Sequence, residues 1–169
     1  DAAHRSRVAA SSAPAWPARL AGVAGAYAMA GGIVTLTGWA ANIPRLADWK
    51  GDGIAMFPNT AVAAALAGLC ILLSGRSGRA SRALARSAAL FVALIGGATL
   101  WQHVTGIDLG IDTLLFDRAW GQIAAAAPSR MGPPASASYL VIGTALLLAT
   151  YPVRARRFSA ALGVSVGAA

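Results

Sequence analysis

The segment of residues 106–118 contains the best candidates for a binding site in this sequence. Asp108 and Asp112 stand four residues apart, and on a helix this spacing places both carboxylates on one face. Phe116 and three leucines give the segment an apolar side. The pattern predicts a short helix lying flat at a membrane interface, and the alternative is a lip that senses a ligand or a cation. Gly110 interrupts the alternating oxygen ligands that a calcium loop requires.

His103 and Asn59 are two further polar residues, each near the end of an apolar run. Helical metal or haem sites need two or more converging ligands, so we predict that His103 makes a hydrogen bond inside a helical bundle, with pH sensing as an alternative. Asn59 and Thr60 follow a proline and are predicted to cap a helix. The alternative for Asn59 is a polar contact at the outer mouth of the bundle.

We predict no catalytic, cofactor-binding or metal-binding residue, and therefore a chain that is not itself an enzyme. The sequence contains no glycine-rich phosphate loop, no His-Glu-x-x-His motif and no nucleophile elbow. Carboxylates are missing from the apolar runs, which argues against an ion-coupled transporter. Cys70 is the single cysteine, so an intrachain disulfide is impossible and we predict that it packs inside.

Four largely apolar, uncharged runs make up most of the chain and hold or flank these residues. The chain is 57% hydrophobic and 12% charged, whereas soluble domains carry about 25% charged residues. A helix needs about 20 apolar residues to cross a bilayer, and each run approaches or exceeds that length. We therefore predict an all-α, polytopic membrane protein with four transmembrane helices. The runs cover residues 20–44, 53–75, 87–107 and 131–153.

Basic residues predict the orientation of these helices. Most of the bases lie in the tail, in the 76–86 connection and in the segment after the fourth run. The positive-inside rule places these segments, and with them both ends of the chain, in the cytoplasm and the two longer loops outside. The topology-setting residues are Arg76, Arg79, Arg82, Arg86, Arg154, Arg156 and Arg157. The expected interface aromatics are Trp39, Trp49, Trp101 and Trp120. The net charge of +8 is interpreted as attraction to anionic lipid headgroups and not to nucleic acid.

An internal repeat divides the membrane domain, residues 20–158, into two tandem hairpins of the same orientation. Met56 with Pro58, and Gly68, recur at an offset of 75 residues as Met131 with Pro133, and Gly143. Repeat one covers residues 20–75 and repeat two covers residues 87–153. A cytoplasmic tail, residues 1–19, precedes them, and the apolar residues 159–169 are expected to begin a further helix.

Two motifs resemble a known family. They are Met56-Phe-Pro58-Asn59-Thr60-Ala61 and Gly106-Ile-Asp108-Leu-Gly110-Ile-Asp112-Thr-Leu-Leu115-Phe116. Across residues 28–158 the chain resembles the membrane-embedded N-terminal region of bacterial PAS-containing sensor histidine kinases. One departure is Pro134-Ala135-Ser136, where the family favours Asn-Thr-Ala.

The resemblance implies a sensor or input domain of a two-component system in the bacterial inner membrane, which passes a signal from the outer loops or the bilayer to cytoplasmic output domains. The implied sensing residues are Asp108, Asp112, Phe116, His103 and Asn59. The alternative function is that of a small accessory subunit packed against a respiratory or photosynthetic complex. Either function implies contact with other membrane helices, in a homodimer or a larger complex.

Overall fold

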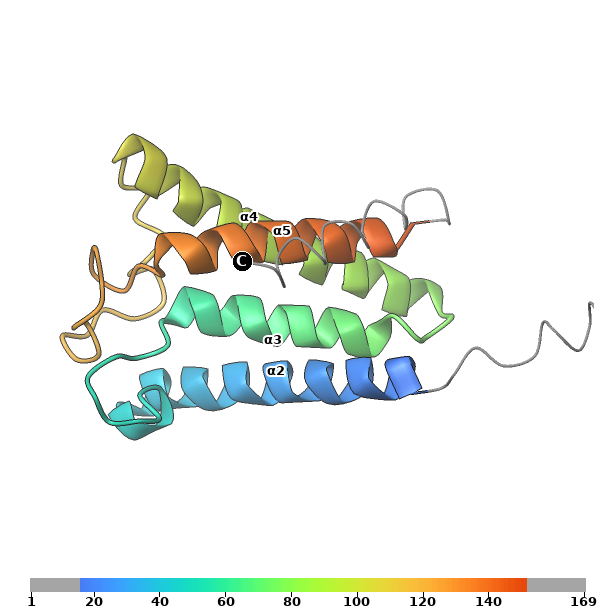
Figure 1. The fold of residues 1–169 in the computed structure, drawn as a ribbon, viewed down its shortest axis with the longest axis horizontal. Helices are drawn as coiled ribbons and strands as arrows, with labels where there is room; N and C mark the ends of the chain where they lie inside the picture. Colours follow the sequence, from blue (N-terminus) through green and yellow to red (C-terminus); the bar gives the residue numbers. More distant parts are fainter. Residues whose placement is uncertain (1–15, 152–169) are drawn as a thin grey trace, which may run out of the picture.

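The computed structural model describes residues 16–151, and this part of the chain is all-helical (Figure 1). It holds four α-helices and one 3-10 helix, and the only strand-like pairing among the described residues is an isolated bridge between Ile54 and Gln122. The elements are α2 (Trp16–Ala41), η1 (Pro44–Leu46), α3 (Pro58–Leu73), α4 (Arg79–Thr105) and α5 (Pro133–Ala149). Several predictions concern residues outside the described part of the chain. They are most of the predicted tail, the predicted further helix, and Arg154, Arg156 and Arg157.

Local sequence explains where these helices begin and end. Pro58 and Pro133 open α3 and α5, where the missing N–H of proline carries no penalty. Asn42 (φ 57°) and Gly106 (φ 73°) adopt the left-handed conformation directly after α2 and α4, which is a common way to end a helix. The expected arginine-rich loop is helical from Arg79 onward, because alanine, leucine and arginine favour helix.

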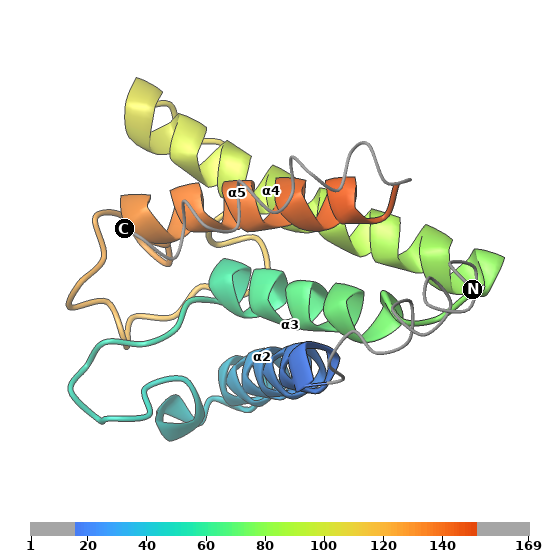
Figure 2. The ribbon, with the colours of Figure 1, turned by 45° about the vertical axis from the view of Figure 1, so that its right-hand side comes forward.

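The helices form a bundle in which α2 pairs with α3, and α4 pairs with α5 (Figures 1 and 2). Both long connections, residues 42–57 and 106–132, lie at one end of the bundle, which we call the loop end. The α3–α4 turn lies at the opposite end, which we call the arginine end. Helix α3 is central and contacts the other three helices.

Two of the four helices have the length and composition of a membrane span. Within residues 16–151, α2 has 26 residues and α4 has 27, and both are apolar enough to cross a bilayer. Helices α3 and α5 are apolar but shorter, with 16 and 17 residues. The predicted all-helical fold is thus confirmed, with two helices of full spanning length where four were expected.

Glycines set the close approach of the helices within each pair. A Cβ on Gly32 or Gly68 would collide with the backbone of the facing helix, and the same holds for Gly96 and Gly143. Gly32 faces Ala61 and Ala65, Gly68 faces Gly25 and Met29, Gly96 faces Ser136 and Leu140, and Gly143 faces Ala93. The contacts between α4 and α5 repeat those between α2 and α3. Each contact position on α4 lies 64 residues after its equivalent on α2, and each contact position on α5 lies 75 residues after its equivalent on α3.

Candidate functional site

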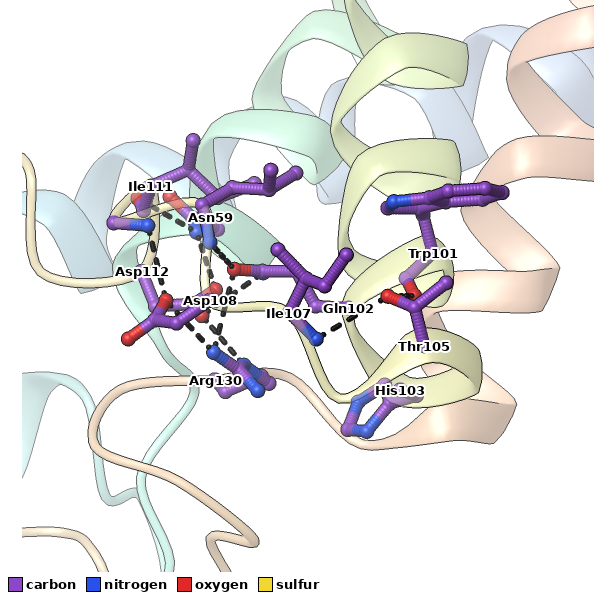
Figure 3. A network of polar contacts seen from close by, with 12 residues as sticks. Asn59, Trp101, Gln102, His103, Thr105, Ile107, Asp108, Ile111, Asp112 and Arg130 are labelled. Atoms are coloured by element: carbon purple, nitrogen blue, oxygen red, sulfur yellow. Dashed lines mark hydrogen bonds and ion pairs between the residues drawn. The ribbon is translucent and has the colours of Figure 1, made fainter.

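A polar network at the loop end is centred on the carboxylate of Asp112 (Figure 3). Asp112 Oδ1 accepts a hydrogen bond from Asn59 Nδ2 of α3 at 3.2 Å. Its Oδ2 accepts from Gln102 Nε2 of α4 at 3.0 Å and from Arg130 Nε, just before α5, at 2.6 Å. The Asp112 side chain is only 4% exposed. One buried carboxylate therefore joins α3, α4 and the segment that leads into α5.

Second contacts of Gln102 and Arg130 extend this Asp112 network. Arg130 Nη2 donates to Gln102 Oε1 at 3.3 Å and to Asp108 Oδ1 at 3.0 Å. Gln102 Oε1 also accepts from the Leu109 amide at 2.7 Å. The Asp108 side chain is 74% exposed, and exposed ion pairs contribute about 0–1 kcal/mol. Because breaking a buried pair costs about 3–5 kcal/mol, the pair of Arg130 with Asp112 dominates the network.

The predicted interfacial helix over residues 106–118 is wrong, because the structure has no helix there. Gly110 adopts a left-handed φ of 67°, and the Asp108 carboxylate accepts from the Gly110 amide at 2.9 Å. This local turn replaces the helix. Asp108 and Asp112 still come together, because both bind Arg130 and not because they share a helix face.

Asn59 lies within α3 but does not cap it. The N-cap residue of α3 is Phe57, and no side chain caps this end. The Asn59 amide instead donates to the Ile111 carbonyl at 3.1 Å as well as to Asp112. The structure therefore contradicts the capping prediction and shows the alternative, a polar contact at the mouth of the bundle.

His103 lies beside the Asp112 network and binds elsewhere (Figure 3). Its Nε2 is 2.8 Å from the Met131 carbonyl oxygen, and a carbonyl can only accept, so Nε2 must carry the proton. The predicted hydrogen bond inside the bundle is present. Within residues 16–151 no three His, Cys, Asp or Glu side chains cluster as they would around a metal.

Phe116 joins an aromatic cluster and does not join the Asp112 network. The cluster packs around Trp39, whose ring centroid is 4.1 Å from that of Trp120, 6.5 Å from that of Phe116 and 6.4 Å from that of Phe57. Trp39, predicted to be an interface aromatic, is completely buried, so its ring packs against protein. Trp49 and Trp101 are about half exposed.

The second long connection covers the end of the first hairpin through this cluster. Arg118 Nε donates to the Trp39 carbonyl at 3.0 Å, which places a cation at the negative C-terminal end of α2. Trp120 Nε1 donates to Asn42 Oδ1 at 3.0 Å. The connections of the two hairpins thus form one continuous cap at the loop end.

Asp48 organises the first long connection. Burial disfavours its charge, but the amides of Gly53, Gly51 and Asp52 donate to the carboxylate, and together with the Arg45 charge they lower the pKa of Asp48 below its ordinary value. This carboxylate therefore holds its own loop, whereas Asp112 joins separate elements.

Sequence reasoning missed Gln102 and Arg130 as members of the site. Gln102 is 1% exposed, and the available signal was an amide inside an apolar run, next to His103. Arg130 was counted only as a loop base. Its signal was its position directly before the Met131-Gly-Pro133 helix entry.

The Asp112 carboxylate accepts from three side-chain donors, so the site is suited to holding elements together. Cys70 is buried and free, as predicted.

Compared with known proteins, the chain matches no family model, no curated protein and no solved structure.

Proposed function

We propose that this chain is the non-catalytic sensor or input domain of a bacterial signal-transduction protein of the histidine kinase type. In this proposal four helices span the inner membrane, and the chain enters and leaves the bundle in the cytoplasm. The arginine end faces the cytoplasm and the loop end faces outward.

Length does not exclude α3 and α5 as spans. At about 1.5 Å per residue, helices of 16 and 17 residues reach about 24–26 Å, against a hydrocarbon core of about 30 Å. A mismatch of this size costs only fractions of a kcal/mol per Å. Helices α3 and α5 pack along the longer α2 and α4. On that side, protein and not lipid lies beside the ends of the shorter helices.

The matched glycine contacts support two tandem hairpin repeats. Gly32 with Ala61 and Gly96 with Ser136 make the same backbone approach at the same relative positions. Small residues allow helices to pack closely in lipid. Repeats of equal orientation would place both long connections on the same side of the membrane, in agreement with their common position in Figure 1.

The observation that carries the sensor proposal is the position of Asp112 between the hairpins. Its carboxylate binds Asn59 of the first hairpin, and Gln102 and Arg130 of the second. A signal that withdraws Asp112 would release α3 from α4 at the loop end and would favour a second arrangement of the bundle. The candidate sensing residues are Asp108, Asp112 and Asn59 in the network, with Phe116 and His103 beside it.

Apolar faces on α2 and α4 favour the second candidate function, that of an accessory subunit in a larger membrane complex. These helices expose large hydrophobic side chains that lipid or partner helices would cover. The exposed residues include Leu20, Val23, Tyr27, Ile33, Leu90, Phe91, Leu94 and Val104.

The size of the native polypeptide distinguishes the two functions. An antibody against residues 76–86 is used on a denaturing gel of cell membranes. A band several times larger than the 17.0 kDa of this chain supports an input domain joined to output domains. A band near 17.0 kDa rejects that proposal and favours the accessory subunit, which would then copurify with its complex in fixed stoichiometry.

A further inference from the structure

A cavity of about 290 Å³ lies at the arginine end, between the α3–α4 turn, the first turns of α4 and the end of α5. We propose that it binds a phosphate ester, supplied by the headgroup of an anionic phospholipid or by a soluble phosphate. Its lining includes Arg76, Arg82 and Thr150. The lipid source rests on the proposed membrane embedding, whereas the anion site itself does not.

Charge favours an anion in this cavity. The ends of α3 and α5 each contribute about −0.5 of an elementary charge, and the guanidinium groups of Arg76 and Arg82, which line the cavity, contribute two positive charges. Within residues 16–151 neither Arg76 nor Arg82 belongs to an ion pair, and every described carboxylate lies in the loop-end connections. The remaining positive charge of about one suits a phosphate ester, because arginine binds phosphate oxygens in a forked geometry.

Size favours a headgroup over a whole lipid. Small-molecule sites have volumes of about 300–1,000 Å³, and this cavity lies at the lower limit of that range. The cytoplasmic leaflet is rich in anionic lipid and attracts basic residues at the membrane surface. A phospholipid whose phosphate occupies the cavity would keep its acyl chains in the bilayer beside the helices.

The position of the cavity gives the bound anion a structural role. Arg76 belongs to the turn after the first hairpin, whereas Arg82 and Thr150 belong to the second, so one phosphate would bridge the two hairpins. Arg86 already holds the end of α5, with Nε and Nη2 each 3.3 Å from the Thr150 oxygens and the guanidinium 4.6 Å from the Tyr151 ring centroid. Bound lipid would therefore stabilise the point where the chain leaves the bundle.

The test compares two variants that lose the same charge. The cavity variant is Arg76→Gln with Arg82→Gln. The control is Arg19→Gln with Arg79→Gln, which removes two arginines from the same end without touching the cavity lining. The full chain is placed in nanodiscs of phosphatidylcholine, with or without phosphatidylglycerol, and its thermal midpoint is measured. A second arm adds inorganic phosphate to the phosphatidylcholine discs.

We expect phosphatidylglycerol to raise the midpoint of the wild type and of the control by several degrees, and to leave the cavity variant unchanged. Stabilisation by inorganic phosphate alone, lost in the same variant, would assign the site to soluble phosphates. An equal response of both variants, or no response of the wild type to either anion, overturns the proposal. A wild-type chain that fails to elute with the discs counts against the membrane embedding, and the inorganic phosphate arm, repeated in detergent, then decides the anion site by the same comparison of variants.

Discussion

Trp39 and His103 make the same hydrogen bond in the two hairpins. Trp39 Nε1 donates to the Met56 carbonyl at 2.9 Å, and His103 Nε2 contacts the Met131 carbonyl at 2.8 Å. Each methionine stands two residues before the proline that opens the next helix. The indole and the imidazole differ chemically, yet both hold the entry of the second helix to the end of the first.

Replacing either ring with phenylalanine tests this equivalence. Trp39→Phe and His103→Phe keep an aromatic ring but remove the donor, and a buried carbonyl without a partner costs about 1–3 kcal/mol. We expect both variants to lower the thermal midpoint in detergent. His103→Gln retains a donor and should recover part of the loss. A His103→Phe variant as stable as the wild type would show that this contact does not contribute.

The glycine contacts predict opposite effects of the same substitution at different positions. Gly96→Ala and Gly143→Ala place a Cβ against the backbone of the facing helix, and overpacking of this kind costs about 1–3 kcal/mol. Gly22→Ala meets no atom within 4 Å. It should be neutral or stabilising by up to about 1 kcal/mol, because alanine favours helix over glycine. Thermal midpoints of the three variants provide the comparison, and equal effects would contradict this packing.

The pair of Asp112 with Arg130 should be costly to break from one side. Asp112→Leu leaves Arg130 without its buried counter-ion and with only the exposed Asp108 carboxylate, and we expect a loss of about 3–5 kcal/mol in the free energy of unfolding. The double variant Asp112→Leu with Arg130→Met removes both charges and should be more stable than either single variant.

Asp108→Asn is the matched control for this pair, because it changes a carboxylate that also binds Arg130 but is mostly exposed. It should cost no more than about 1 kcal/mol. If Asp108→Asn lowered the free energy of unfolding as much as Asp112→Leu does, the buried pair would not be the dominant contact of the network.

Asp48 predicts an acid-sensitive first loop. The pKa of Asp48 is lowered in the folded chain, whereas an unfolded aspartate titrates near about 3.9. The stabilisation is therefore fully present above about pH 4 and is lost as the pH falls through the lower, folded pKa. Hydrogen exchange of the Gly51 and Gly53 amides should lose protection in that range. Asp48→Asn should remove this pH dependence, and Asp52→Asn should preserve it.

The apolar runs and prolines were enough to predict the helices, because a proline at the first turn and a run of apolar residues are local signals. Pro58 and Pro133 mark two helix starts correctly. The helix predicted over residues 106–118 was wrong, because a four-residue spacing places two side chains on one face only if the backbone is helical. Gly110 adopts a left-handed φ instead, and the two carboxylates meet through Arg130, which is a long-range contact.

The Asp112 network was predicted only in part for the same reason. Asp108, Asp112 and Asn59 were identified from motifs, but Arg130, which binds both carboxylates, stands 18 residues beyond Asp112 along the chain. Gln102 is one amide in an apolar run, and nothing local distinguishes it from a lipid-facing residue. Trp39 was assigned to the membrane interface because tryptophan near a run end is typical of that place, whereas its burial depends on Trp120.

The proposed orientation predicts which cysteines an impermeant maleimide can reach. Native Cys70 is fully buried and should not react, so single cysteines can be added to the natural chain. Ala124→Cys lies in the second long connection and should be labelled in intact cells. Ser77→Cys lies in the α3–α4 turn and should be labelled only after the membrane is opened. The reverse pattern would place the arginine end outside, and labelling of both in intact cells would show that the chain does not separate two compartments.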